Sequence, residues 1–198
     1  MSASIAGFLS IITSFLITGG LHEDGLADVA DGFGGGWSRE RKLEIMHDSS
    51  IGTYGTFALI ASVAIRALGY GEILTDQANI VQSVLIFAGI GCLSRTPLIY
   101  MMYKLKPARL DGRAVEAGKP SRNMMRQAVF SAVIITTLFI MFSRGFSPAV
   151  LTIFSAVAAY VLIKYICLKQ IGGYTGDVLG SLQQITEIFA ILLLIAIV

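Results

Sequence analysis

Long uncharged runs alternate with short polar segments along the whole chain, and this alternation is its most informative feature. A membrane-spanning helix needs about 20 mostly apolar residues. Candidate spans occupy residues 4–17, 53–70, 80–103, 128–143, 149–168 and 179–198. Strand-like alternation of polar and apolar residues is absent, which argues against a β-barrel. We therefore predict an all-α, polytopic membrane protein with about six transmembrane helices.

The composition agrees with a membrane protein. Only 14% of the 198 residues are charged, 55% are hydrophobic, and the mean hydropathy is +0.73. Ordinary globular domains carry about 25% charged residues. The length suits a single integral membrane domain over residues 1–198. Cys92 and Cys167 lie in apolar runs without metal-ligand spacing, so we interpret both as small core residues. The first run has no preceding basic segment, so a signal peptide is not expected.

The segment between residues 104 and 126 is strongly basic. Its only acids are Asp111 and Glu116, and its basic residues are Lys104, Lys106, Arg109, Arg113, Lys119, Arg122 and Arg126. Cytoplasmic loops carry an excess of lysine and arginine, so we expect this segment in the cytoplasm. Counting spans from it places residues 19–52 and 169–180 on the same face. The three segments with unusual polar chemistry are therefore expected to share one side of the membrane.

The stretch HEDGLADVADG, residues 22–32, puts four carboxylates directly after the first apolar run. If it forms a helix, Asp24, Asp28 and Asp31 fall within about 60° of one another. Glu23 lies off this stripe, and His22 points almost opposite to it. Stacked carboxylates beside a membrane need a compensating cation, and Mg²⁺ binds through carboxylates together with substrate phosphates. The alternative is a solvated acidic helix face.

Glycine-rich segments follow at several places. FGGGW, residues 33–37, predicts a turn that admits a bulky ligand, or else a flexible connector. Residues 38–46 predict a short amphipathic helix whose basic side chains face an anionic substrate or lipid headgroups. In HDSSIGTYG, residues 47–55, Asp48 and Ser49 occupy the position of a helix N-cap, with a role near a metal as the alternative for Asp48. IGGYTGDVLG, residues 171–180, ends with Asp177 just before the last span.

Glu187, Arg95 and Arg66 are charged residues within predicted spans. An intramembrane charge is a functional hypothesis by default. Glu187 is expected about 15 Å below the cytoplasmic entrance. Arg95 lies in the cytoplasmic half of its span, and an Arg95–Glu187 ion pair is the structural alternative to a role in binding. Arg66 lies toward the outer end of its helix, and we expect its side chain to snorkel to the membrane surface.

Three motifs carry a resemblance to a known family. GGLHEDGLADVADG, LEIMHDSSIGTYG and GGYTGDVLGSLQQITE, in this order, resemble the signature regions of the cobalamin synthase family. The family activity is that of adenosylcobinamide-GDP ribazoletransferase. The resemblance implies a Mg²⁺-dependent enzyme of the inner membrane that acts late in cobalamin (vitamin B12) biosynthesis. It joins adenosylcobinamide-GDP to α-ribazole or its 5′-phosphate and releases GMP, with the active site facing the cytoplasm.

The resemblance and the residue patterns together assign a site. We expect Asp24, Asp28 and Asp31 to hold Mg²⁺, with Asp48 or Asp177 completing the catalytic carboxylates and Glu23 as a further candidate ligand. The cationic candidates for the substrate diphosphate are Arg95, Arg109 and Arg113. Further substrate-binding candidates are Ser49, Gly52, Gly173, Thr175 and Glu187. One carboxylate accepts the proton of the nucleophile, and the pattern does not say which.

Two departures and two rivals qualify this interpretation. Family members usually carry a longer segment before the first acidic motif, so the N-terminal part is expected to be missing or shortened here. They also often have a basic residue where Ser50 stands.

One rival is a CDP-alcohol phosphotransferase, but Gly25 is not followed by that family's pattern. The other is an ion-coupled transporter, which Glu187 would suit. Membrane lipid is an expected partner, nucleic acid is not, and homo-oligomerisation is left open.

Overall fold

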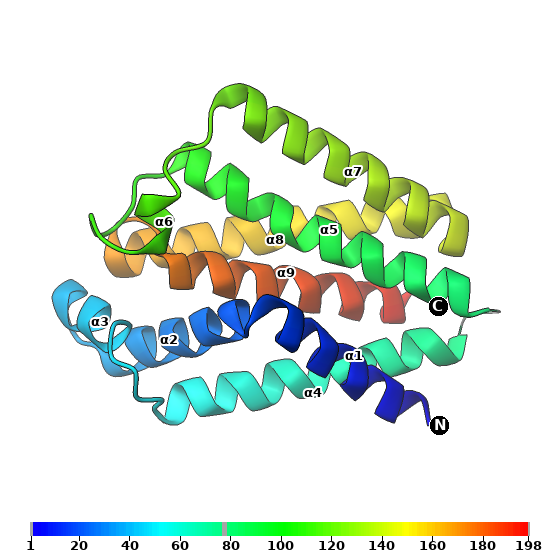
Figure 1. The fold of residues 1–198 in the computed structure, drawn as a ribbon, viewed down its shortest axis with the longest axis horizontal. Coiled ribbons are helices and arrows are strands. Elements are labelled where there is room, and N and C mark those ends of the chain that lie inside the picture. Colours follow the sequence, from blue (N-terminus) through cyan, green and yellow to red (C-terminus); the bar gives the residue numbers. More distant parts are fainter. Residues whose placement is uncertain (1, 77–78, 198) are drawn as a thin grey trace.

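The computed structural model describes residues 2–76 and 79–197, except for the side chain of Arg113 (Figure 1). Within these ranges the chain forms helices and no strand. Its helices are α1 (Ala3–Thr18), α2 (Leu21–Gly35), α3 (Arg39–Ile45), α4 (Thr53–Asp76), α5 (Ile80–Lys104), α6 (Arg113–Glu116), α7 (Arg122–Arg144), α8 (Phe146–Ile171) and α9 (Gly176–Ala196). The predicted all-α class is confirmed. Val198, the predicted end of the last span, lies outside the described residues.

Five helices of the described chain are long and apolar enough to cross a membrane by themselves, namely α4, α5, α7, α8 and α9. The α1 helix meets the criterion only together with α2, and the two axes are bent by 93° at the break between them. Gly19 and Gly20 form this break with φ of 64° and 71°, a left-handed conformation that favours glycine. The protein is therefore a polytopic helical membrane protein with five or six spans.

The most buried helix is α9, and it organises the bundle. In its apolar window 72% of the residues are buried, against 17% for α7. It packs against α2 and α4 on one side and against α5 and α8 on the other, as Figure 1 shows. Leu182 and Ile191 of α9 belong to two separate buried apolar clusters. A polar residue on α9 is therefore placed inside protein rather than against lipid.

The polar connections gather at one end of the molecule. Figure 1 shows α3, α6 and the short connection between α8 and α9 at this end, and both chain termini at the other. Tyr174 and Pro107 form an isolated parallel bridge that joins two of these connections. The convergence of the three polar segments, which the charge pattern predicted, is present in the fold.

Several local predictions were wrong in detail. The FGGGW segment was expected to be a turn, but α2 continues to Gly35 because Gly36 N–H still donates to Gly32 O at 3.0 Å. Asp48 was expected to cap the helix that follows it, but α4 begins only at Thr53. Asp177 was expected before the last span, and it lies inside the first turn of α9, which Thr175 caps.

Candidate active site

Two glycines bring α2 close to the start of α9. A Cβ atom at Gly25 would lie only 2.8 Å from the carbonyl oxygen of Asp177. On the other helix, a Cβ atom at Gly180 would lie 3.2 Å from the carbonyl oxygens of Leu21 and His22. The contact at Gly25 leaves no room for a Cβ atom, and those at Gly180 are tight, so the two backbones approach each other closely. The acidic residues that flank Gly25 are thereby held beside Asp177.

We call Asp24, Asp28 and Asp177 the acidic cluster. Asp24 is exposed, whereas Asp28 and Asp177 are partly buried. The charges of Asp24 and Asp177 both act on Asp28, and the charge of Asp24 acts on Asp177. Like charges that share a partly desolvated site repel one another, and an added cation relieves this repulsion. The cluster thus has the electrostatic character of a cation site.

The positively charged side chain of Arg109 lies next to the acidic cluster. Its Nη2 lies 3.5 Å from Asp177 Oδ2, and its Nε lies 3.7 Å from Asp111 Oδ1. Thr175 donates its hydroxyl to the same Asp177 oxygen at 3.1 Å and also caps α9 by accepting from Val178 N–H. Arg109 and Asp177 are about one-fifth exposed, so an anionic ligand can reach them. Arg113 begins α6, but its side chain lies outside the described part of the chain.

The connections around the cluster are tied together by backbone contacts. Arg39 donates Nε to Ile171 O at 2.9 Å and also donates Nη2 to Ala108 O. Ala108 N–H donates to Tyr174 O at 2.8 Å, which holds Arg109 next to the start of α9. A Cβ atom at Gly173 would lie 2.5 Å from the carbonyl oxygen of Lys106. Gly173, expected to contact substrate, is therefore packed against the protein backbone.

Asp31 lies near enough for its charge to act on Asp28, but its carboxylate oxygens have partners elsewhere. It is buried, and its carboxylate accepts from Gly52 N–H at 2.7 Å and from Gly55 N–H at 2.9 Å. The first N–H groups of a helix lack partners within the helix, so Asp31 caps α4 from a distant segment. Of the predicted stripe of three aspartates, Asp31 therefore stabilises the start of α4, whereas Asp24 and Asp28 remain in the acidic cluster. Gly52, predicted to bind substrate, is one of the donors to Asp31.

The exposed loop before α4 has its own local order. Asp48 accepts from the hydroxyl of Ser50 at 2.6 Å and from its N–H at 2.9 Å. These bonds, led by the one from the hydroxyl, lower the pKa of the Asp48 carboxyl because they stabilise its charged form. Ser49 is exposed beside it. His47, at the start of this loop, lies close enough for its charge to act on Asp177. The sequence patterns did not assign His47 to the site.

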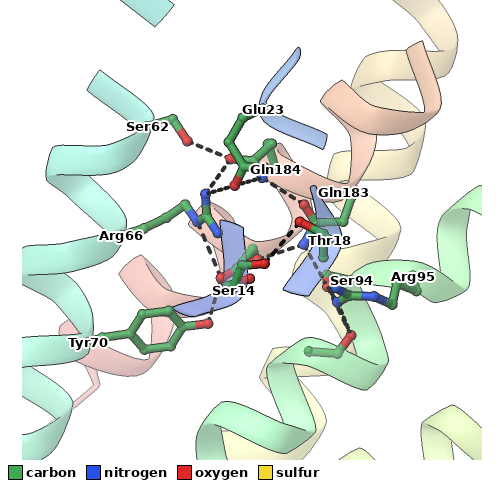
Figure 2. Close-up of polar contacts among 12 residues, drawn as sticks. Ser14, Thr18, Glu23, Ser62, Arg66, Tyr70, Ser94, Arg95, Gln183 and Gln184 are labelled. Carbon is green, nitrogen blue, oxygen red and sulfur yellow. Dashed lines mark hydrogen bonds and ion pairs between the residues drawn. The ribbon is translucent and has the colours of Figure 1, made fainter. Parts of the chain in front are cut away.

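A buried ionic network lies deeper in the bundle, and Figure 2 shows its side chains pointing toward one another. Arg66 is fully buried, with Nη1 at 2.9 Å from Glu23 Oε1 and Nε at 3.3 Å from Glu187 Oε1. The prediction that Arg66 snorkels to the surface was wrong. The suggested Arg95–Glu187 ion pair was also wrong, because Arg66 occupies that place.

Amide side chains complete the network. Gln184 accepts from Arg66 Nη1 at 2.6 Å and donates to Glu23 at 3.1 Å. Glu187 accepts from Gln183 at 2.6 Å and from the Tyr70 hydroxyl at 2.7 Å. Glu187, expected to bind substrate, is buried in the core. Sequence reasoning missed the two glutamines, although adjacent amides in an apolar span are a readable signal of buried polar contacts.

The fit of a divalent cation can be judged from the donors present. Within residues 2–76 and 79–197, no three His, Cys, Asp or Glu side chains lie close enough together to hold a metal ion by themselves. The acidic cluster nevertheless supplies hard carboxylate oxygens, which Mg²⁺ prefers and which it shares with substrate phosphates. Glu23 and Asp31 already have protein partners. The open cluster therefore fits a cation that is held jointly by protein and substrate.

The fold and this site define a class of protein, an integral membrane protein with a carboxylate-rich site and a neighbouring arginine at one end of a helical bundle. The family model for cobalamin-5-phosphate synthase matches residues 1–195. The chain belongs to this family.

Curated relatives agree with this assignment. The adenosylcobinamide-GDP ribazoletransferase of Rhizobium etli (strain CIAT 652) is 41% identical over 93% of this chain and 70% of its own length. The enzyme of the same name from Sinorhizobium medicae is 42% identical over 94% of this chain and 71% of its own length. The enzyme of the same name from Bradyrhizobium diazoefficiens is 40% identical over 97% of this chain and 71% of its own length. No solved structure matches the chain.

Proposed function

We propose that this chain joins adenosylcobinamide-GDP to α-ribazole or its 5′-phosphate and releases GMP. The observation that carries the proposal is the acidic cluster beside Arg109, in a chain whose relatives carry the name of this transferase. A ribose hydroxyl of ribazole attacks the phosphorus attached to cobinamide. A new P–O bond forms, the diphosphate P–O bond breaks, and GMP leaves with the bonding electrons.

Mg²⁺ is the proposed cofactor, with Asp24, Asp28 and Asp177 as its protein ligands. When bound, it neutralises charge on the diphosphate. The three carboxylates orient the cation and the substrate, and one of them accepts the proton of the attacking hydroxyl. Glu23 and Asp31 act through position, because each anchors α2 to a neighbouring helix.

Arg109 is the proposed contact for the substrate diphosphate. Its guanidinium lies at the edge of the acidic cluster, where it already meets Asp177. A planar guanidinium pairs well with phosphate oxygens. Phosphoryl transfer depends on positioning and charge neutralisation more than on covalent help, which suits a site made of carboxylates and one arginine. Thr175 holds Asp177 in place by its hydroxyl.

The proposed location is the inner membrane, with the acidic cluster facing the cytoplasm. The support is the excess of lysine and arginine in residues 104–126, which lead from α5 into α7 at the end that carries α3 and α6. Nucleotide substrates are found in that compartment. A cysteine introduced at Lys119 should be protected from a membrane-impermeant thiol reagent in intact cells. Labelling from outside would invert this orientation.

The activity can be tested directly. Purified protein in phospholipid vesicles with Mg²⁺ should release GMP from adenosylcobinamide-GDP only when α-ribazole or its 5′-phosphate is present. Asp28→Asn should lower turnover by about 100-fold or more, which is typical for removing a group that stabilises transition-state charge. Glu44→Gln, on the exposed face of α3, serves as the matched control. Near-normal turnover of Asp28→Asn would remove the acidic cluster from the mechanism.

A further inference from the structure

A groove runs along the side of the bundle, separate from the acidic cluster. It has a volume of about 600 Å³ and lies among α1, the end of α4 and α5. We call it the lateral groove, and its walls include Ser14, Thr18, Leu74, Val84, Phe87 and Arg95. The walls are mostly apolar, and their helices are spans or part of the bent α1–α2 pair. The lateral groove therefore opens toward lipid rather than toward water.

Arg95 is a charge without a protein counter-charge in this groove. Its Nη1 donates to Gly91 O at 2.7 Å and to Ser94 Oγ at 3.2 Å, both on its own helix. Figure 2 shows Arg95 beside Ser94. Among the described residues it forms no ion pair, whereas Arg66, the other spanning-helix arginine of the interior, pairs with two carboxylates. Its side chain is exposed. A cation inside a membrane is costly unless an anion accompanies it.

Ser83 lies at the other end of the lateral groove. It lines the lateral groove, is only 1% exposed, and its Oγ has no hydrogen-bond partner among the described residues. Ser83 and Arg95 are separated by about 18 Å along α5, at 1.5 Å per residue. The groove is thus elongated, with a cation near one end, a hydroxyl near the other, and apolar side chains between them.

We propose that the lateral groove binds one acidic phospholipid, whose phosphate pairs with Arg95 and whose acyl chain lies along Val84 and Phe87. Arg95 lies about 14 Å from the end of α5, counted at 1.5 Å per residue from Lys104, which places it within the bilayer. The long arginine side chain can extend toward the headgroup region, and a lipid is the anion that reaches it there from the side. A net negative headgroup is favoured because a zwitterionic lipid brings its own cation to compete with Arg95.

The test measures lipid that stays with the protein. Wild-type protein purified in a phosphorus-free detergent is loaded with phosphatidylglycerol, washed, and assayed for phosphorus per polypeptide. We expect about one retained lipid in the wild type and at least a fivefold loss in Arg95→Gln. Val84→Trp fills the groove without touching Arg95 and should cause a similar loss. Arg122→Gln removes an exposed arginine at the start of α7, outside the groove, and should retain lipid as the wild type does.

Controls separate the lipid from other sources of phosphate. Phosphatidylcholine should be retained at least fivefold less than phosphatidylglycerol, and inorganic phosphate or a nucleoside monophosphate should not displace the bound lipid. Arg95→Lys, which preserves the charge, should retain at least half of the wild-type amount. The proposal would be overturned if Arg95→Gln retained as much lipid as the wild type. It would also be overturned if both lipids bound equally or if a soluble phosphate displaced the bound lipid. Helical content and a single elution peak show that each variant is folded.

Discussion

Arg66 Nη1 lies 2.9 Å from Glu23 Oε1, and both side chains are buried. This contact joins the middle of α4 to the first turn of α2, one residue before Asp24. The same arginine meets Glu187 of α9, so one guanidinium links three helices. The acidic cluster lies on two of these helices. Its geometry therefore depends on an ionic network that does not itself touch the cluster.

Removing Arg66 should be severely destabilising. Arg66→Met leaves two buried carboxylates without their cation, and breaking a buried ion pair typically costs about 3–5 kcal/mol. The measurement is thermal unfolding in detergent, followed by loss of the single elution peak. Arg41→Met, which removes an exposed ion pair with Glu44, should cost at most about 1 kcal/mol. Equal losses of thermal stability in the two variants would show that the buried ion pairs of Arg66 contribute no more than an exposed one.

Close packing at Gly25 should be required for activity. Gly25→Ala places a Cβ atom 2.8 Å from the carbonyl oxygen of Asp177. The helices α2 and α9 must therefore separate, which opens the acidic cluster. We expect GMP release to fall at least about tenfold, since catalysis is sensitive to small displacements. Gly35→Ala is the matched control in the same helix, because its Cβ would meet Ile45 at an ordinary 3.7 Å. Full activity of Gly25→Ala would argue against a shared site of the two helices.

Asp31 and Asp28 should differ in their response to Mg²⁺. Asp31→Asn weakens the hydrogen bonds to Gly52 and Gly55, so it should cost about 1–3 kcal/mol and loosen the start of α4. Hydrogen exchange over residues 52–56 should increase, while the Mg²⁺ concentration for half-maximal activity stays within about twofold of the wild type. Asp28→Asn should instead raise that concentration, because a proposed ligand is lost. A large rise for Asp31→Asn would restore Asp31 to the metal site.

Arg109 should matter for binding the diphosphate. Arg109→Gln leaves the fold intact, because the side chain is partly exposed and its contact with Asp177 is long, at 3.5 Å. We expect the KM for adenosylcobinamide-GDP to rise at least about tenfold, the loss of roughly one charge-assisted hydrogen bond. The KM for α-ribazole should change little. Arg122→Gln provides the control, and an unchanged KM for both substrates in Arg109→Gln would exclude the proposed contact.

The positions of the spans and of the acidic motif could be predicted from sequence, because both depend on local properties. The length and apolarity of a segment decide whether it can cross a bilayer, whichever helices surround it. The charge of residues 104–126 predicted which polar segments gather at one end. The roles of Asp31 and Arg66 could not be predicted in this way. Helical spacing placed Asp31 on the same stripe as Asp28, but spacing does not say what lies opposite each position.

By itself, the sequence determined an all-α membrane protein whose carboxylates, glycines and arginines are concentrated at one end. Only the tertiary structure decided which carboxylates remain open. Glu23 and Asp31 are taken up by Arg66 and by the first N–H groups of α4. Asp24 and Asp28 instead lie near enough to Asp177 for their charges to interact. The reason is physical. A buried charge must find a partner within a few ångströms, and the identity of that partner depends on which helices lie side by side.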